Sequence, residues 1–73
     1  MADFTLLVQR ANATATAWYV PEGNEPVTVE AADAVSAAVW GLRELKVYPK
    51  FERLLLWEGR EMSGPRRIFH SGS

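Results

Sequence analysis

Apolar residues near the start of the chain recur at every second position, which is the period of a half-buried β-strand. Over residues 4–10 this pattern places on one face Phe4, Leu6 and Val8. After a short turn, residues 14–20 are rich in Thr and aromatic side chains and predict a second strand. Its alanines fit beneath a helix with Trp18 on the reverse face, although the pattern alone does not decide the side.

The middle of the chain changes from turn residues to a helical period. Residues 21–26 are typical of turns, and residues 27–30 predict a short strand or an extended lead into a helix. Asp33 is a candidate N-cap for a helix over residues 34–46, because its carboxylate can accept from free backbone amides. Gly41 weakens this helix by about 1 kcal/mol relative to Ala, so we expect it to allow the close approach of a backbone or a large ring. The apolar stripe of the helix is Val35, Ala38, Val39, Leu42 and Leu45.

Two further strands complete the pattern. Residues 52–58 contain the near-continuous apolar run 54–57, which is typical of a central strand covered on both faces. A loop follows, and residues 65–70 predict a last strand whose Pro65 suits its first position or an edge. The order β-β-(β)-α-β-β indicates an α+β domain, with a single antiparallel sheet of four to five strands and one helix packed on one face. The other face must be polar or a contact surface, and we expect some apolar area to show there.

Length and composition indicate one small domain. The chain has 73 residues and no cysteine, so neither a disulfide nor a thiolate metal site supports its thin core. We expect residues 1–70 to form the domain and residues 71–73 to be a disordered tail. No apolar run reaches the roughly 18 residues that a membrane span needs, and the acidic start is unlike a signal peptide. We therefore expect a cytoplasmic protein.

The net charge of −1 hides an asymmetry between the two halves of the chain. Residues 1–40 hold one basic and five acidic residues, whereas residues 41–73 hold seven basic and four acidic residues. The near-neutral total is unlike that of a general nucleic-acid binder. The split either marks a polarised surface or disappears as the two halves interleave in the sheet.

No residue pattern predicts catalysis, a metal site or a bound cofactor. His70 is the only histidine and is expected at the surface, so the chain lacks both a buried histidine base and a multi-histidine metal site. The glycine-rich motifs that bind phosphates are also missing. One helix on one sheet leaves little room for an enclosed substrate site. We expect a protein that is not an enzyme and that binds no cofactor or metal.

Trp40 is the most informative residue because it lies off the apolar stripe, about 140° from Val35 on the helical wheel. Either a loop, residues 48–49 or 21–26, folds over it, or Trp40 is an exposed anchor. In the second case Trp40 and Arg43 form one patch of the residue types that are enriched at binding hot spots.

Basic residues of the second half form another candidate surface, which could face phosphates or an acidic protein partner. They follow the helix and occupy the last hairpin: Lys46, Lys50, Arg53, Arg60, Arg66 and Arg67. The alternative is ordinary solvated charge, which also protects edge strands from pairing.

The layout of the chain resembles small phage- and prophage-encoded inhibitors of the anti-CRISPR type. The resembling stretch, residues 27–45, runs from an extended segment into an alanine-rich helix and is followed by the strand 54–57. The resemblance implies a stoichiometric binder that blocks a bacterial defence nuclease complex. It is a resemblance of layout and assigns no role to any residue.

These observations leave functions of different classes open. The first is a protein-binding module or inhibitor that contacts a protein or nucleoprotein partner through Trp40, Arg43 and the basic residues. The second is a nucleic-acid-binding or regulatory accessory domain that uses the basic set between Lys46 and Arg67, although no RNA-binding motif is recognisable. A homodimeric structural component, with the open sheet face or the last strand as its interface, is the third.

Overall fold

The computed structural model describes residues 1–71, and over that range it contains one helix and one antiparallel sheet of five strands. The long strand β1 (Ala2–Ala11) is central. Strand β4 (Glu52–Glu58) pairs along one side of β1, and β5 (Arg66–Phe69) pairs with β4 and forms that edge of the sheet. Residues 52–58 thus form a central strand, as their apolar run predicts.

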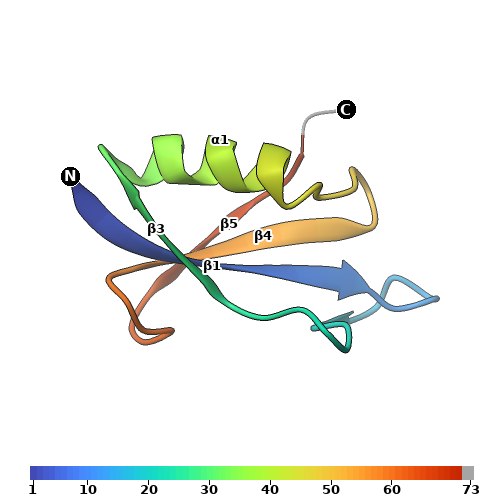
Figure 1. The fold of residues 1–73 in the computed structure, drawn as a ribbon. Coiled ribbons are helices and arrows are strands. Elements are labelled where there is room, and N and C mark those ends of the chain that lie inside the picture. The colour runs from blue at the N-terminus through green and yellow to red at the C-terminus, as the bar shows by residue number, and fades with distance from the viewer. Residues whose placement is uncertain (72–73) are drawn as a thin grey trace.

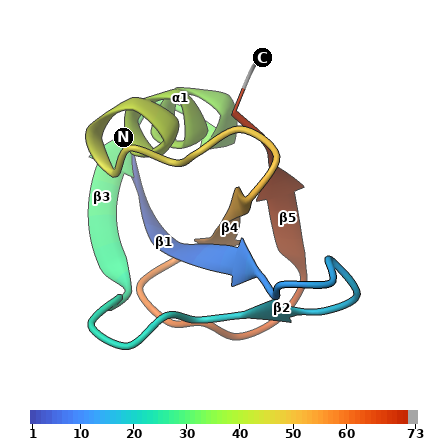
Figure 2. The same ribbon diagram turned by 90° about the vertical axis from the view of Figure 1, so that its right-hand side faces the viewer.

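The other side of β1 is shared by two short strands. β2 (Trp18–Tyr19) pairs with the C-terminal end of β1, and β3 (Val27–Ala31) pairs with its N-terminal half. The helix α1 (Ala34–Glu44) lies across one face of this sheet (Figure 1). In the turned view, β3 and β5 lie on opposite sides of β1 and β4 (Figure 2). The predicted fold class, one antiparallel sheet with one helix on one face, is confirmed.

The main core lies between α1 and the two central strands. Its sheet side is formed by alternate residues of β1 and β4, namely Phe4, Leu6, Val8, Leu54 and Leu56. Its helix side is formed by small residues, namely Ala34, Ala37 and Ala38, with Val47 from the segment after the helix. Removal of these apolar side chains from water is the main driving force for this fold.

The sheet face away from α1 carries a second, smaller apolar cluster. Leu7, Leu55 and Trp57 pack together there and are at most 7% exposed. Residues 54–57 are therefore covered on both faces. Some apolar area shows on this face, as expected: these three side chains are buried, but Ile68 of β5 is 42% exposed.

The start of α1 is the predicted one, but its end is not. The Asp33 carboxylate accepts a hydrogen bond from the Ser36 amide at 2.7 Å, which satisfies a donor that the first turn leaves free. The helix ends at Glu44, before the predicted end at Lys46, and Lys46 adopts a left-handed φ of 52°.

The buried side of α1 also differs from the predicted stripe. Ala38 of that stripe is buried and Leu42 and Leu45 pack against the core, but Val35 and Val39 are 60% and 53% exposed. In place of the two valines, the helix turns Ala34, Ala37 and Gly41 to the sheet, and a Cβ added at Gly41 would lie 2.8 Å from Leu6 and 2.9 Å from Leu54. The sheet is too close for larger side chains, so small residues and not the most apolar ones decide which side is buried. Gly41 does allow a close approach, but the approaching groups are the side chains of Leu6 and Leu54 and not a backbone or a large ring.

The second predicted strand is much shorter than residues 14–20, because only Trp18 and Tyr19 pair with β1. Before them the Asn12 side chain accepts hydrogen bonds from the amides of Thr16 and Ala17. Such local bonds offer the backbone an alternative to strand pairing. The alanines of this segment are exposed and do not lie beneath the helix, whereas Trp18 lies on the face away from α1.

The described residues include the predicted domain, residues 1–70. Of the predicted tail, Ser71 is half-buried, and residues 72–73 lie outside the described range. Disorder of that tail stays a prediction.

Candidate functional site

Trp40 borders a groove between α1 and β3. The groove has a volume of about 400 Å³, and its lining residues are Val29, Glu30, Ala31, Ser36, Ala37 and Trp40. The side chain of Trp40 is 37% exposed, so part of its ring faces solvent. Neither loop expected as a cover, residues 48–49 or 21–26, lines this groove. These positions favour the interpretation of Trp40 as an exposed anchor.

One wall of this groove is the free edge of β3. In an antiparallel pair, residues alternate between those that exchange backbone hydrogen bonds and those that do not. The Asp3 carbonyl of β1 points to the β4 side, where it accepts a hydrogen bond from the Gly59 amide at 2.8 Å. Glu30 is the pair partner of Asp3, so the backbone groups of Glu30, and those of Thr28 two residues earlier, point away from β1. No strand within residues 1–71 pairs with that side.

Acidic residues without ion-pair partners accompany this edge. Between Ala11 and Leu42 the chain has no basic residue. Its acids there lie in β3 or in the turns on either side of it: Glu22, Glu25, Glu30 and Asp33. Among residues 1–71, none of these four carboxylates takes part in an ion pair. The hydrogen bond from Ser36 holds the pKa of Asp33 below its usual value. The free edge of β3 is therefore acidic.

The basic residues expected near Trp40 lie on α1 and in the segment after it. Arg43 is exposed on α1, and its Nε lies 3.4 Å from the carboxylate of Glu44. Lys46 and Lys50 follow the helix, are exposed and adopt left-handed φ angles of 52° and 77°. Exposed ion pairs such as that of Arg43 contribute little to stability, so these cations are available at the surface.

The basic residues of the last hairpin lie elsewhere. Arg60 follows β4, and its guanidinium lies 3.7 Å from the Asp3 carboxylate. Arg66 and Arg67 are exposed on β5, which is the edge of the sheet opposite to β3. The structure therefore does not bring Trp40 into one surface with Arg66 and Arg67, because β1 and β4 lie between the two edges. Part of the charge asymmetry of the sequence becomes a difference between an acidic and a basic edge.

An aromatic and basic cluster on the face away from α1 was not identified from the sequence. The Arg53 guanidinium lies 4.4 Å from the centre of the Trp18 ring, within the range of a cation–π contact. The His70 ring meets Trp18 edge-on at 6.3 Å between centroids. Burial and the neighbouring charge of Arg66 lower the pKa of Arg53. Trp18 and Arg53 are far apart in the chain, so only strand pairing brings them together.

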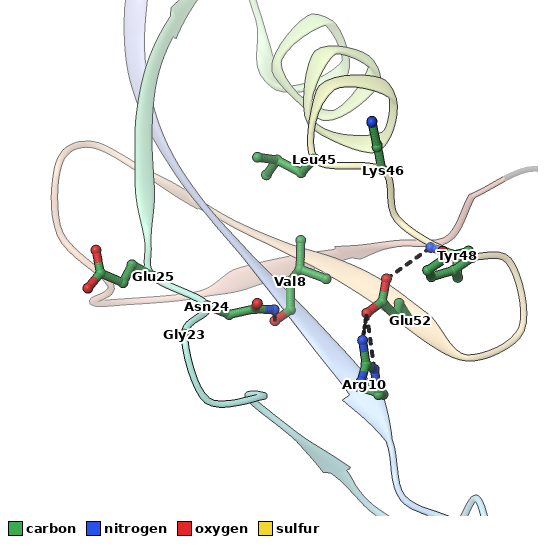
Figure 3. A pocket seen from close by; sticks show the side chains of 9 residues that line it. All are labelled: Val8, Arg10, Gly23, Asn24, Glu25, Leu45, Lys46, Tyr48 and Glu52. Carbon is green, nitrogen blue, oxygen red and sulfur yellow. Dashed lines mark hydrogen bonds and ion pairs between the residues drawn. The ribbon is translucent and has the colours of Figure 1, made fainter.

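A more polar cavity of about 390 Å³ contains an ion pair between β1 and β4. Arg10 donates to Glu52 Oε2 from Nη2 at 3.1 Å and from Nε at 3.2 Å, and the Tyr48 amide donates to Glu52 Oε1 at 3.1 Å (Figure 3). The hydrogen bond to Glu52 raises the pKa of Arg10. Glu52 is 5% exposed and both of its oxygens are engaged. The Glu52 carboxylate therefore links β1 to the segment before β4 and is not free to act as a general base.

The described part of the chain contains no group of three or more His, Asp or Glu side chains that could hold a metal ion. No helix among residues 1–71 is long and apolar enough to cross a membrane. Comparison of the chain with protein families, curated proteins and solved structures found no match.

Proposed function

We propose that this chain is a small protein-binding module and that its contact surface is centred on Trp40. The observation that carries the proposal is the position of this residue: a partly exposed Trp borders a groove whose other wall is an unpaired strand edge. Trp is enriched among the residues that contribute most to binding, because it buries a large area with few rotatable bonds. Arg43 lies one turn further along α1 and extends this surface.

The module acts by covering a surface of its partner and catalyses no reaction. This part of the proposal is supported by the polar cavity, where the buried carboxylate of Glu52 is held by Arg10 and by the Tyr48 amide. The layout resemblance to phage-encoded inhibitors supports a finer proposal. In that proposal the partner is a bacterial defence complex in the cytoplasm, and binding blocks it stoichiometrically.

The replacement of Trp40 by Ala tests the binding surface. We expect Trp40→Ala to reduce capture of the partner from a host lysate by about tenfold or more while the domain stays folded. Val39→Ala is the matched control, because Val39 is the neighbouring exposed apolar residue of α1. Undiminished capture by Trp40→Ala would refute this surface. A loss of several kcal/mol in the free energy of unfolding would also refute it, because such a loss is typical of a buried Trp.

The inhibitor proposal has a separate test in bacteria that carry CRISPR immunity. Expression of the chain should raise the plating efficiency of a targeted phage, and Trp40→Ala should abolish this effect. An unchanged plating efficiency on hosts with each main type of CRISPR complex would contradict the inhibitor proposal and leave the binding proposal in place.

A nucleic-acid-binding function is the second candidate, and the cluster of Trp18, Arg53 and His70 favours it. A cluster of aromatic and basic side chains can stack bases and neutralise phosphates. The test is the binding of single-stranded DNA or RNA as a function of salt, since phosphate contacts weaken steeply as salt is raised. Arg66→Ala should weaken such binding more than Arg60→Ala, because the charge of Arg66 neighbours Arg53, whereas Arg60 lies beyond the end of β4. No binding at low salt would exclude this function.

A further inference from the structure

We propose that the free edge of β3 binds an extended, basic segment of a partner protein by strand addition, with Trp40 packed against the added strand. This inference rests on the proposed function and names the chemistry of the partner. It combines three independent features of the same place: unpaired backbone groups, an apolar wall and uncompensated negative charge.

The backbone of β3 is arranged to accept another strand. The amide and carbonyl groups of Thr28 and Glu30 point away from β1, because the pair Asp3–Glu30 exchanges no backbone hydrogen bonds. A strand edge with free groups is a template for pairing with another chain, and proteins commonly protect such edges with Lys, Pro or a covering element. Residues 27–31 contain neither Lys nor Pro. β5, by contrast, has two arginines in it, whereas a proline precedes both strands, Pro26 before β3 and Pro65 before β5.

The groove supplies specificity for alternate side chains of the added strand. Successive side chains of a strand point to opposite faces. Those on the α1 side enter the space lined by Ala37 and Trp40, which suits apolar side chains. Those on the other side lie next to the side chains of Thr28 and Glu30. The preferred ligand is therefore a segment in which apolar and basic residues alternate.

Charge complementarity selects a basic ligand. Glu30 in β3 and Asp33 just after it have no ion-pair partner within residues 1–71. Glu22 and Glu25 in the turn before β3 also form no ion pair, although Glu25 lines the other cavity together with Arg10 and Lys46. Opposite charges on neighbouring strands stabilise pairing, whereas like charges directly opposite oppose it. An acidic segment would add further repulsion to an edge that is already negative.

A second copy of this chain fits the edge less well than a partner segment does. The basic strand β5 is the only complementary strand in the described residues, and it spans Arg66–Phe69. Its Phe69 packs against the main core of its own domain. Its Arg67, which shares a face with Phe69, would enter the space beside Trp40, where the groove favours an apolar side chain.

The experiment uses the whole chain and a blocked, dye-labelled peptide of about eight residues in which Val alternates with Lys. Fluorescence anisotropy should give a Kd for this peptide below about 1 mM at an ionic strength of about 0.15 M. A peptide with Glu in place of Lys should bind at least about tenfold more weakly. A Lys–Val peptide with N-methylated amides on its pairing edge should also bind at least about tenfold more weakly, because it lacks the donors for strand addition. Equal binding of the three peptides, or no binding of the first, would overturn the inference.

Variants of β3 test the same point from the side of the protein. Thr28→Pro removes an outward amide without removing a bond to β1 and should weaken binding of the Lys–Val peptide about tenfold or more, whereas Thr28→Ala should leave it unchanged. Glu30→Lys should weaken binding in the same way, and Glu61→Lys, in the turn before β5, is its charge-matched control. If Thr28→Pro does not fold, the N-methylated peptide and Glu30→Lys still decide the question. Full binding by a folded Thr28→Pro would contradict strand addition, and full binding by Glu30→Lys would contradict the selection of a basic ligand.

Two outcomes separate this inference from the proposed function. Partner capture that is lost in Trp40→Ala but retained in Thr28→Pro would support the Trp40 surface and refute strand addition. Capture retained in Trp40→Ala would refute the proposed surface itself. Light scattering completes the test by measuring the oligomeric state. If the parent chain is a dimer and Glu30→Lys dissociates it, the edge binds a second copy of the chain, and the proposed ligand is wrong.

Discussion

A Cβ atom added to Gly41 would lie 2.8 Å from the Cδ1 atom of Leu6, which is closer than carbon atoms pack in protein interiors. Leu6 is fully buried, so it has little freedom to move away. The absence of a side chain at Gly41 therefore sets how closely α1 approaches the sheet.

Gly41→Ala should destabilise the domain despite its better helix propensity. The gain in propensity is about 1 kcal/mol, whereas overpacking a dense core costs about 1–3 kcal/mol. We expect a net loss of about 1 kcal/mol, measured by urea unfolding. Val39→Ala, at an exposed position of the same helix, should not be destabilising. A Gly41→Ala variant more stable than the parent would contradict this prediction and show that Leu6 and Leu54 can move away from the added methyl group.

The two sides of α1 should respond differently to substitution. Val35→Lys and Val39→Lys change exposed positions and should alter the free energy of unfolding by less than about 0.5 kcal/mol. Ala37→Leu enlarges a fully buried residue and should cost about 1–3 kcal/mol. Thermal unfolding followed by circular dichroism distinguishes the two results. A large loss in the free energy of unfolding for Val39→Lys would show that Val39 is buried, as the apolar stripe predicts from the sequence.

The ion pair of Arg10 and Glu52 should be asymmetric in its response to mutation. Arg10→Ala leaves a buried carboxylate whose Oε2 has lost its donor, whereas Glu52→Gln leaves a guanidinium that is 47% exposed and can be hydrated. We therefore expect Arg10→Ala to lower the urea midpoint more than Glu52→Gln. A double-mutant cycle measures the coupling between the two groups. A larger loss in Glu52→Gln would contradict this order.

Asp33 should make the stability of the domain depend on pH in the acidic range. The hydrogen bond from the Ser36 amide holds the pKa of Asp33 in the folded chain below its unfolded value. The resulting stabilisation is present above the unfolded pKa, near pH 4, and is lost as pH falls through the folded pKa. Asp33→Asn retains a capping side chain without the charge. The parent should be more stable than Asp33→Asn at neutral pH, and the difference should shrink as pH falls below about 4. A difference that does not depend on pH would exclude a contribution from the charge.

Local chemistry decided the features that the sequence predicted well. Asp33 caps α1 because its carboxylate reaches an amide of the first turn, and no distant residue is involved. The run 54–57 is apolar at every position, so it must be covered on both faces whatever lies above and below it. The length of the second strand was predicted wrongly because the Asn12 side chain competes for the amides of Thr16 and Ala17. The strand propensity of the Thr-rich segment gave no sign of that competition.

The sequence by itself determined the α+β class, the helix start at Asp33, the central position of residues 52–58 and the unusual placement of Trp40 off the apolar stripe. These depend on periodicity and on residue types that act within a few positions. Only the tertiary structure decided which side of α1 is buried, because close packing on Leu6 and Leu54 favours small residues over Val35 and Val39. It alone placed the acidic residues along β3 and Arg66 and Arg67 along β5, since strand pairing and not chain order decides which strands form the two edges of the sheet.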